Sequence, residues 1–144
     1  MDAMNVTSKA VEVRPKAGET EKMTVNVGVV DLGQVDLLVQ EGFYSNRSDL
    51  VRTALRNQLA LHAETVKATV ARRTLVVGLQ HFDRVDLERA VTAGERLHVQ
   101  VVGLARIADD VTPELARAAI ESVTVLGAFQ ASAAVRKALS DRIH

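Results

Sequence analysis

Cysteine and tryptophan are absent from this sequence of 144 residues, and aromatic residues make up only 3% of it. Without cysteine the chain forms no disulfides and offers no thiolate as a nucleophile or metal ligand. Because aromatic side chains are so scarce, its core must be built from Val, Leu, Ile and Ala. These absences exclude a disulfide scaffold and all cysteine-based chemistry.

Long apolar runs are also absent. No stretch approaches the roughly eighteen apolar residues of a membrane span, and the polar start, residues 1–9, lacks the apolar region of a signal peptide. We therefore expect a cytoplasmic protein without membrane contacts.

An excess of charge of either sign is also absent, since 18 Lys and Arg balance 18 Asp and Glu. DNA affinity leans on phosphate neutralisation, so a DNA-binding role would require positive groups gathered on one face or a multimer.

Residues 22–30 alternate between apolar and polar side chains. One side of this segment would carry Met23, Val25, Val27 and Val29, and the other Lys22, Thr24, Asn26 and Gly28. This period of two predicts a strand with one buried and one polar face. A lone strand leaves its own backbone groups without partners, so the pattern calls for a second strand.

Two helices are predicted after the strand. Residues 31–41 place Leu32, Val35, Leu38 and Val39 at helical spacing, and Gly42 stands where a helix would end in a left-handed residue. The second helix begins after Asn46 as its N-cap, and its apolar stripe comprises Leu50, Val51, Ala54, Leu55 and Leu59. It continues as a long helix, or a helix with a short connector, up to residue 73. One strand and two helices make too small a core for one chain, which predicts an intertwined homodimer.

Residues 21–62 resemble the ribbon-helix-helix family of bacterial and phage DNA-binding proteins. The resemblance combines the alternating strand, the turn Gly42-Phe-Tyr-Ser-Asn46 and the run from Arg47 to Arg56. It implies a homodimer that inserts a two-stranded antiparallel ribbon into the major groove of double-stranded DNA. The function implied is a sequence-specific transcriptional regulator, a repressor associated with the nucleoid.

The polar face of the strand supplies the candidate base contacts. Asn26 suits a paired hydrogen bond to adenine, Thr24 a hydrogen bond and a thymine methyl, and Lys22 a guanine or a phosphate. At the start of the second helix, Asn46, Arg47 and Ser48 are candidates for a phosphate contact, because helix N-termini carry free amides and partial positive charge. The competing interpretations are an ordinary solvated strand face for Thr24 and Asn26, and a simple helix cap for Asn46.

Residues 74–144 contain a repeat. Three apolar runs align on their glycines at intervals of 25 and 24 residues, and each is closed by its glycine: Thr74 to Gln80 with Gly78, Val99 to Ala105 with Gly103, and Val123 to Phe129 with Gly127. A short helical stretch follows each run, at 85–91, 112–120 and 132–139, and Thr112-Pro113 is a good helix start. The pattern predicts parallel strand-turn-helix units in a small solenoid-like layer whose free edges support higher oligomers.

The prediction is therefore an α+β chain with a disordered tail at 1–20, a ribbon-helix-helix domain at 21–73 and a parallel β/α repeat domain at 74–144. The repeat domain would assemble dimers or bind a protein partner. No catalytic constellation, metal-ligand cluster or nucleotide loop is present, so we expect neither enzymatic activity nor a cofactor or metal. Two alternatives stay open. The first is an antitoxin of a toxin pair, which is disfavoured because such antitoxins usually carry a short flexible tail where this chain has an ordered domain. The second is a DNA-organising scaffold.

Overall fold

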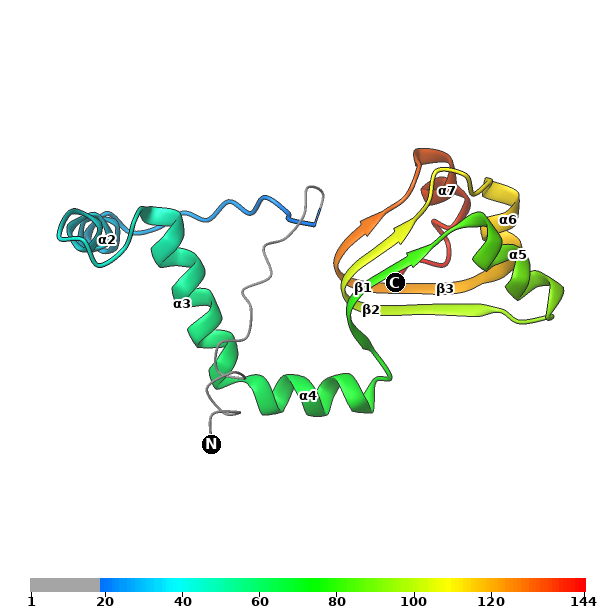
Figure 1. The fold of residues 1–144 in the computed structure, drawn as a ribbon, viewed down its shortest axis with the longest axis horizontal. Helices are drawn as coiled ribbons and strands as arrows, with labels where there is room; N and C mark the ends of the chain where they lie inside the picture. The colour runs from blue at the N-terminus through cyan, green and yellow to red at the C-terminus, as the bar shows by residue number, and fades with distance from the viewer. Residues whose placement is uncertain (1–18) are drawn as a thin grey trace, which may run out of the picture.

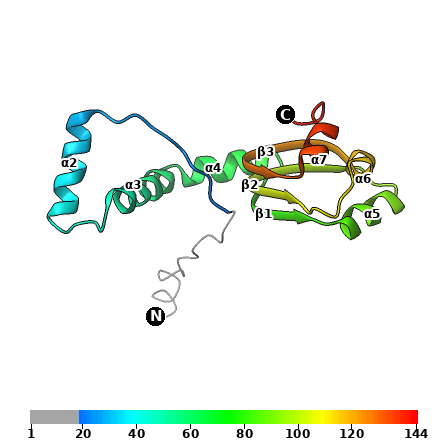
Figure 2. The ribbon, with the colours of Figure 1, turned by 90° about the horizontal axis from the view of Figure 1, so that it is seen from above.

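The computed structural model describes residues 19–144. The tail predicted to be disordered, residues 1–20, lies outside the described residues apart from Glu19 and Thr20. The described chain has two parts, which Figures 1 and 2 place at opposite ends of helix α4 (Ala63–Arg72). At one end lie helices α2 (Val29–Gln40) and α3 (Arg47–Leu61), and at the other lies a sheet with its own helices.

The segment predicted as a strand is not paired in the single chain. Residues 20–28 are extended and contact no neighbouring strand, so they carry no strand assignment. The prediction also ran two residues too far, because Val29 and Val30 form the first turn of α2. The reason is physical: a strand exists only with a hydrogen-bonding partner, and the described chain supplies none for this segment.

The turn between α2 and α3 follows the sequence closely. Gly42 has a φ of +86°, its N–H donates to the carbonyl of Val39, and the Phe43 N–H donates to that of Leu38. This pair of bonds is the Schellman motif, and it confirms the predicted left-handed helix end. The predicted continuation beyond Leu59 resolves into two helices, since α3 ends at Leu61 and α4 begins at Ala63 after a break at His62.

The second part is a three-stranded parallel sheet in the order β1 (Val76–Phe82), β2 (Leu97–Ile107) and β3 (Ile120–Gln130). Helices α5 (Arg84–Thr92), α6 (Pro113–Ala119) and α7 (Ala133–Ala138) follow the strands in turn. Thr112 accepts a hydrogen bond from the Leu115 N–H at 3.1 Å, with Pro113 in the first helical position, as the sequence predicts. Each of the three strands is thus followed by a turn and then by a helix.

The glycines pair with one another across the sheet, and they lie within the strands. Gly78 pairs with Gly103 and Gly103 with Gly127, at φ angles of +130°, +139° and +123°. The prediction that each glycine closes its strand was wrong, since every strand continues past it. A Cβ on Gly103 would meet the Gly78 carbonyl oxygen, and one on Gly127 that of Gly103, so only glycine allows this approach of backbones.

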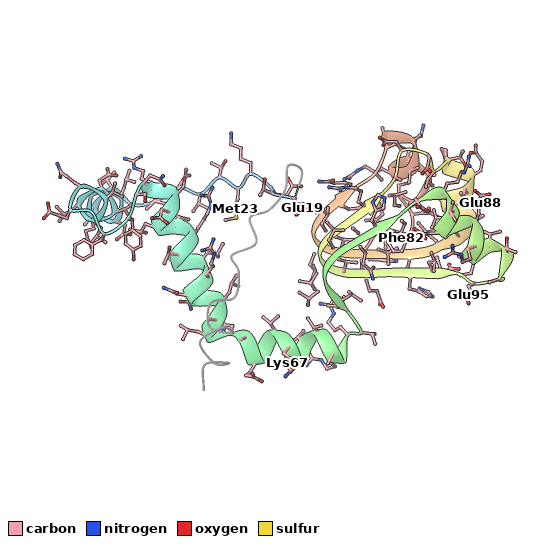
Figure 3. The ribbon with its side chains drawn as sticks, viewed as in Figure 1. Glu19, Met23, Lys67, Phe82, Glu88 and Glu95 are labelled. Carbon is pink, nitrogen blue, oxygen red and sulfur yellow. The ribbon has the colours of Figure 1, made fainter. Side chains whose placement is uncertain are left out.

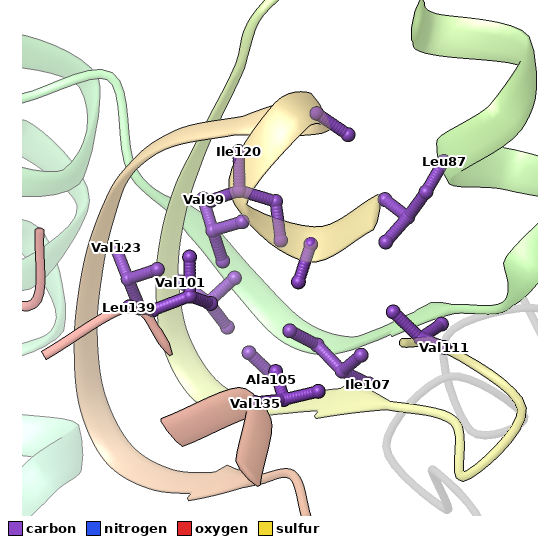
Figure 4. Packing of buried hydrophobic residues seen from close by; sticks show 12 residues of the cluster. Leu87, Val99, Val101, Ala105, Ile107, Val111, Ile120, Val123, Val135 and Leu139 are labelled. Atoms are coloured by element: carbon purple, nitrogen blue, oxygen red, sulfur yellow. The ribbon is translucent and has the colours of Figure 1, made fainter. Parts of the chain in front are cut away.

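The buried core of the described residues lies in residues 74–144, which hold the sheet and its three helices and are called the sheet domain below. Its side chains come from β2 and β3, from α5, α6 and α7 and from the residues next to these elements: Leu87, Val99, Val101, Ala105, Ile107, Val111, Ala116, Ala119, Ile120, Val123, Val135 and Leu139. The strands bend around this cluster (Figure 4), so the helices lie on the concave side of the sheet. Within residues 19–144, no helix combines the length and apolar character needed to cross a membrane.

Candidate nucleic-acid interface

The three candidate base-reading residues lie in the extended segment before α2. Lys22, Thr24 and Asn26 are all exposed, and none of them pairs with another described residue. Between them stand Met23, Val25 and Val27, which are 76%, 63% and 53% exposed. Figure 3 draws Met23 on the side of the segment that faces α3 and α4 in that view. The alternation of polar and apolar side chains is therefore present, but in one chain nothing covers the apolar members.

The helices beside this segment are uncovered in the same way. None of the residues of α2, α3 or α4 is buried. Leu55 and Leu59, in the predicted apolar stripe of α3, are 51% and 55% exposed. Burying an apolar side chain of this size stabilises a protein by about 1.5–3 kcal/mol, so this part of the chain lacks most of the stabilisation that its sequence could supply.

Asn46 caps α3 as the sequence predicts. Its Oδ1 accepts a hydrogen bond from the Asp49 N–H at 2.8 Å. The Asp49 carboxylate reaches back in turn, but it accepts from the Ser45 N–H at 2.9 Å rather than from that of Asn46. The N–H groups of Arg47 and Ser48 are left as the first amides of the helix, without partners among the described residues. Free amides of this kind suit an anion, although Asp49 adds negative charge to the same helix end.

Arg47 is engaged within the chain. Its Nε donates to Asp36 Oδ1 at 2.7 Å and its Nη2 to Asp36 Oδ2 at 2.8 Å, so that the side chain bridges α3 and α2. The hydrogen bonds from Arg47 lower the pKa of the Asp36 carboxyl and raise that of the guanidinium. This partner is not predictable from local sequence, because the contact between residues 11 positions apart depends on the angle between the two helices.

The six candidates form two groups in the described chain. Asn46, Arg47 and Ser48 lie together at the start of α3, whereas Lys22, Thr24 and Asn26 lie along the separate extended segment. No group of His, Cys, Asp or Glu in residues 19–144 is arranged to hold a metal ion. The arrangement can donate hydrogen bonds and positive charge to an elongated polar partner, and it positions no nucleophile beside a base.

The family comparison agrees with this geometry. Residues 18–136 match the model of the ribbon-helix-helix transcriptional regulator family, and the chain therefore belongs to that family. The matched span includes α2, α3, α4 and nearly all of the sheet domain, well beyond the stretch of 21–62 that carries the resemblance in sequence. No curated protein and no solved structure matches the chain.

Proposed function

We propose that the protein is a sequence-specific repressor of transcription that acts as a homodimer. In this proposal, residues 22–28 of two chains pair antiparallel, and the resulting ribbon enters the major groove of DNA. The paired strands would satisfy each other's backbone groups and turn Met23, Val25 and Val27 toward the helices. Lys22, Thr24 and Asn26 would then face the base edges.

The observation that carries the proposal is that the N-terminal part lacks both a partner for its extended segment and a buried core. Its segment 20–28 is extended without a partner, and its three helices contain no buried residue. A second copy supplies the missing partner for both, which supports an intertwined dimer. Membership in a family of transcriptional regulators supports DNA as the partner of the polar face.

The proposed phosphate contact lies at the start of α3. In the proposed complex with DNA, the free N–H groups of Arg47 and Ser48 bind one phosphate oxygen, and Asn46 caps the helix. Arg47 adds its positive charge after exchanging Asp36 for the phosphate. Contacts of this kind set the register of the ribbon on the duplex but read no bases.

The sheet domain distinguishes this proposal from the antitoxin alternative. An antitoxin of this kind usually carries a short flexible tail that folds on its toxin. Here the residues that follow α4 form a domain with a core of its own, which speaks for a standing role in assembly or in binding a partner. No feature of the described residues favours the DNA-organising scaffold over the regulator.

The decisive experiment is selection of bound fragments from the source genome at near-physiological salt, with the wild type, Asn26→Ala and Asn57→Ala in parallel. Asn57 is an exposed amide in the middle of α3 and serves as the matched control. We expect the wild type and the control to enrich one short repeated sequence. The Asn26 variant should lose about 1–3 kcal/mol per contacted site, the value of a good bidentate contact, with unchanged helix content.

The other outcomes are equally informative. Equal enrichment by the Asn26 variant would refute the assignment of the reading face. Even recovery of all fragments by the wild type would favour the scaffold. Recovery of none would remove DNA as the partner and direct attention to protein partners.

A further inference from the structure

The two edges of the sheet differ, because residues 142–144 cover the β3 edge near its start, at Val123. Residues 142–144 lie along it: the Val123 N–H donates to the Arg142 carbonyl at 2.9 Å, and the His144 N–H donates to the Val123 carbonyl at 2.8 Å. The Arg142 guanidinium donates to the carbonyls of Arg117 and Ile120, both at 2.6 Å. The start of this edge is therefore covered by backbone hydrogen bonds and by the Arg142 side chain.

An ion pair holds that covering segment in place. The Arg117 guanidinium donates to both carboxylate oxygens of Asp141, at 2.8 and 3.1 Å, and to the Ala138 carbonyl at 2.7 Å. These hydrogen bonds lower the pKa of Asp141 to about 2, so the pair is charged at any physiological pH. The start of the β3 edge thus has beside it charged groups of the kind that natural sheets use to discourage further pairing.

The β1 edge has no described segment paired along it. One side of β1 pairs with β2, and no other described strand lies along the opposite side. Its seven residues, VVGLQHF, include no Lys, Arg, Asp, Glu or Pro. Val77 and Leu79 are 61% and 47% exposed. An edge strand without charged side chains and with free backbone N–H and C=O groups can form hydrogen bonds with a strand of another chain.

We infer that β1 pairs antiparallel with β1 of a second copy of this chain, joining two three-stranded sheets into one. Identical edges related by a two-fold axis must run antiparallel, and the uncharged sequence places no like charges against each other across that axis. The joined sheet ends on each side at a β3 edge whose start is covered by residues 142–144.

A second copy is the favoured occupant because of the N-terminal part. Under the proposed function two chains already associate there, and α4 tethers each sheet domain to that dimer, which raises the local concentration of one β1 edge near another. The inference rests on the proposed dimer for this tether. The difference between the two sheet edges does not depend on it.

Contact between sheet faces is the competing arrangement. The side of the sheet away from α5, α6 and α7 carries the row Val77, Val102 and Leu126, and Leu79 and Leu104 lie in the next row. Packing two such faces together would bury these side chains but leave the free N–H and C=O groups of β1 unpaired. A test must therefore separate an edge contact from a face contact.

The chain contains no cysteine, so one introduced thiol reports on its own surroundings. We would compare full-length Leu79→Cys with full-length Leu126→Cys, treated with a short bis-maleimide at low protein concentration. Both positions face the same side of the sheet and are 47% and 48% exposed, but they lie on opposite edge strands. Edge pairing predicts a covalent dimer as the main product for Leu79→Cys and only background for Leu126→Cys.

Equal cross-linking of both variants would establish a face contact and overturn the inference, and so would no cross-linking of either. Adding Val77→Lys to Leu79→Cys should abolish most of the product by placing like charges on both edges, whereas adding Leu126→Lys should not. DNA selection by the same proteins separates the two proposals. Failure to cross-link with intact operator selection removes only the β1 pairing, while cross-linking without selection removes only the proposed function.

Discussion

Arg47 stands between two negative partners. In the described chain its guanidinium makes a bidentate pair with Asp36, and in the proposed complex a phosphate competes for the same donors. Both side chains are largely exposed, so water can take over from either partner. Arg47 would then hold α2 against α3 in the free protein and bind the duplex in the complex.

The residue-scale prediction concerns this exchange. Arg47→Ala should weaken binding to all DNA sequences alike and reduce the slope of log K against log salt by about 1, because one phosphate contact is lost. Asp36→Asn should strengthen binding, because the guanidinium is released. Titrations at several salt concentrations measure both, with Arg72→Ala in α4 as the control. An unchanged slope for Arg47→Ala would restrict this residue to its role between the helices.

Local contacts at this scale could be predicted from sequence, and distant ones could not. The Asn46 cap and the left-handed Gly42 depend on neighbours within five positions, and the structure confirms both. The Asp36–Arg47 pair depends on how two helices cross, which no local pattern encodes. Whether Lys22, Thr24 and Asn26 contact bases stays a prediction, since it depends on a second chain and on DNA.

At the scale of elements, the paired glycines Gly78, Gly103 and Gly127 allow a close approach of the three strands. Gly103 lies so close to the Gly78 backbone that a side chain would displace one strand from the next. The spacing of the glycines predicted three parallel strand-turn-helix units, because the repeats have nearly equal length. It did not predict the strand ends, since glycine inside a strand and glycine after a strand look alike in sequence.

We predict that Gly103→Ala destabilises the sheet domain by at least about 1–3 kcal/mol, the cost of a non-glycine residue in such a backbone conformation, with the steric clash in addition. Gly33→Ala provides the control, because this glycine lies inside α2 with open space around its Cα. Helix propensity should make that variant more stable by up to about 1 kcal/mol. Thermal unfolding compares the two, and equal melting temperatures would argue against the tight backbone approach.

Helix α3 carries the second prediction at this scale. Leu55→Asp should convert the protein from dimer to monomer and unfold the N-terminal part, because it places an unpaired charge in the proposed interface. Asn57→Asp introduces the same charge two positions away, on another side of the helix, and should leave the dimer intact. Light scattering and circular dichroism give mass and helix content. A folded dimer of the Leu55 variant would contradict the intertwined arrangement.

For the whole molecule, balanced charge makes assembly important. The 18 basic and 18 acidic side chains cancel, so net charge does not attract the protein to DNA. Affinity for DNA must therefore come from individual phosphate and base contacts, repeated over several copies of the chain. We predict that a chain ending at residue 73 binds a single operator site with near wild-type affinity but loses cooperative occupancy of neighbouring sites. Footprinting on one-site and two-site DNA measures this. Equal cooperativity for both chains would remove the sheet domain from assembly on DNA.

The lack of any buried residue in α2, α3 and α4 has a consequence for gene control. If this part of the chain acquires its core only in a dimer, its folding is a bimolecular reaction, and the amount of active protein rises with the square of chain concentration when chains are few. A small change in synthesis or dilution by growth would then produce a larger change in operator occupancy. The same incomplete fold would expose surplus single chains to proteolysis, which sharpens the threshold further.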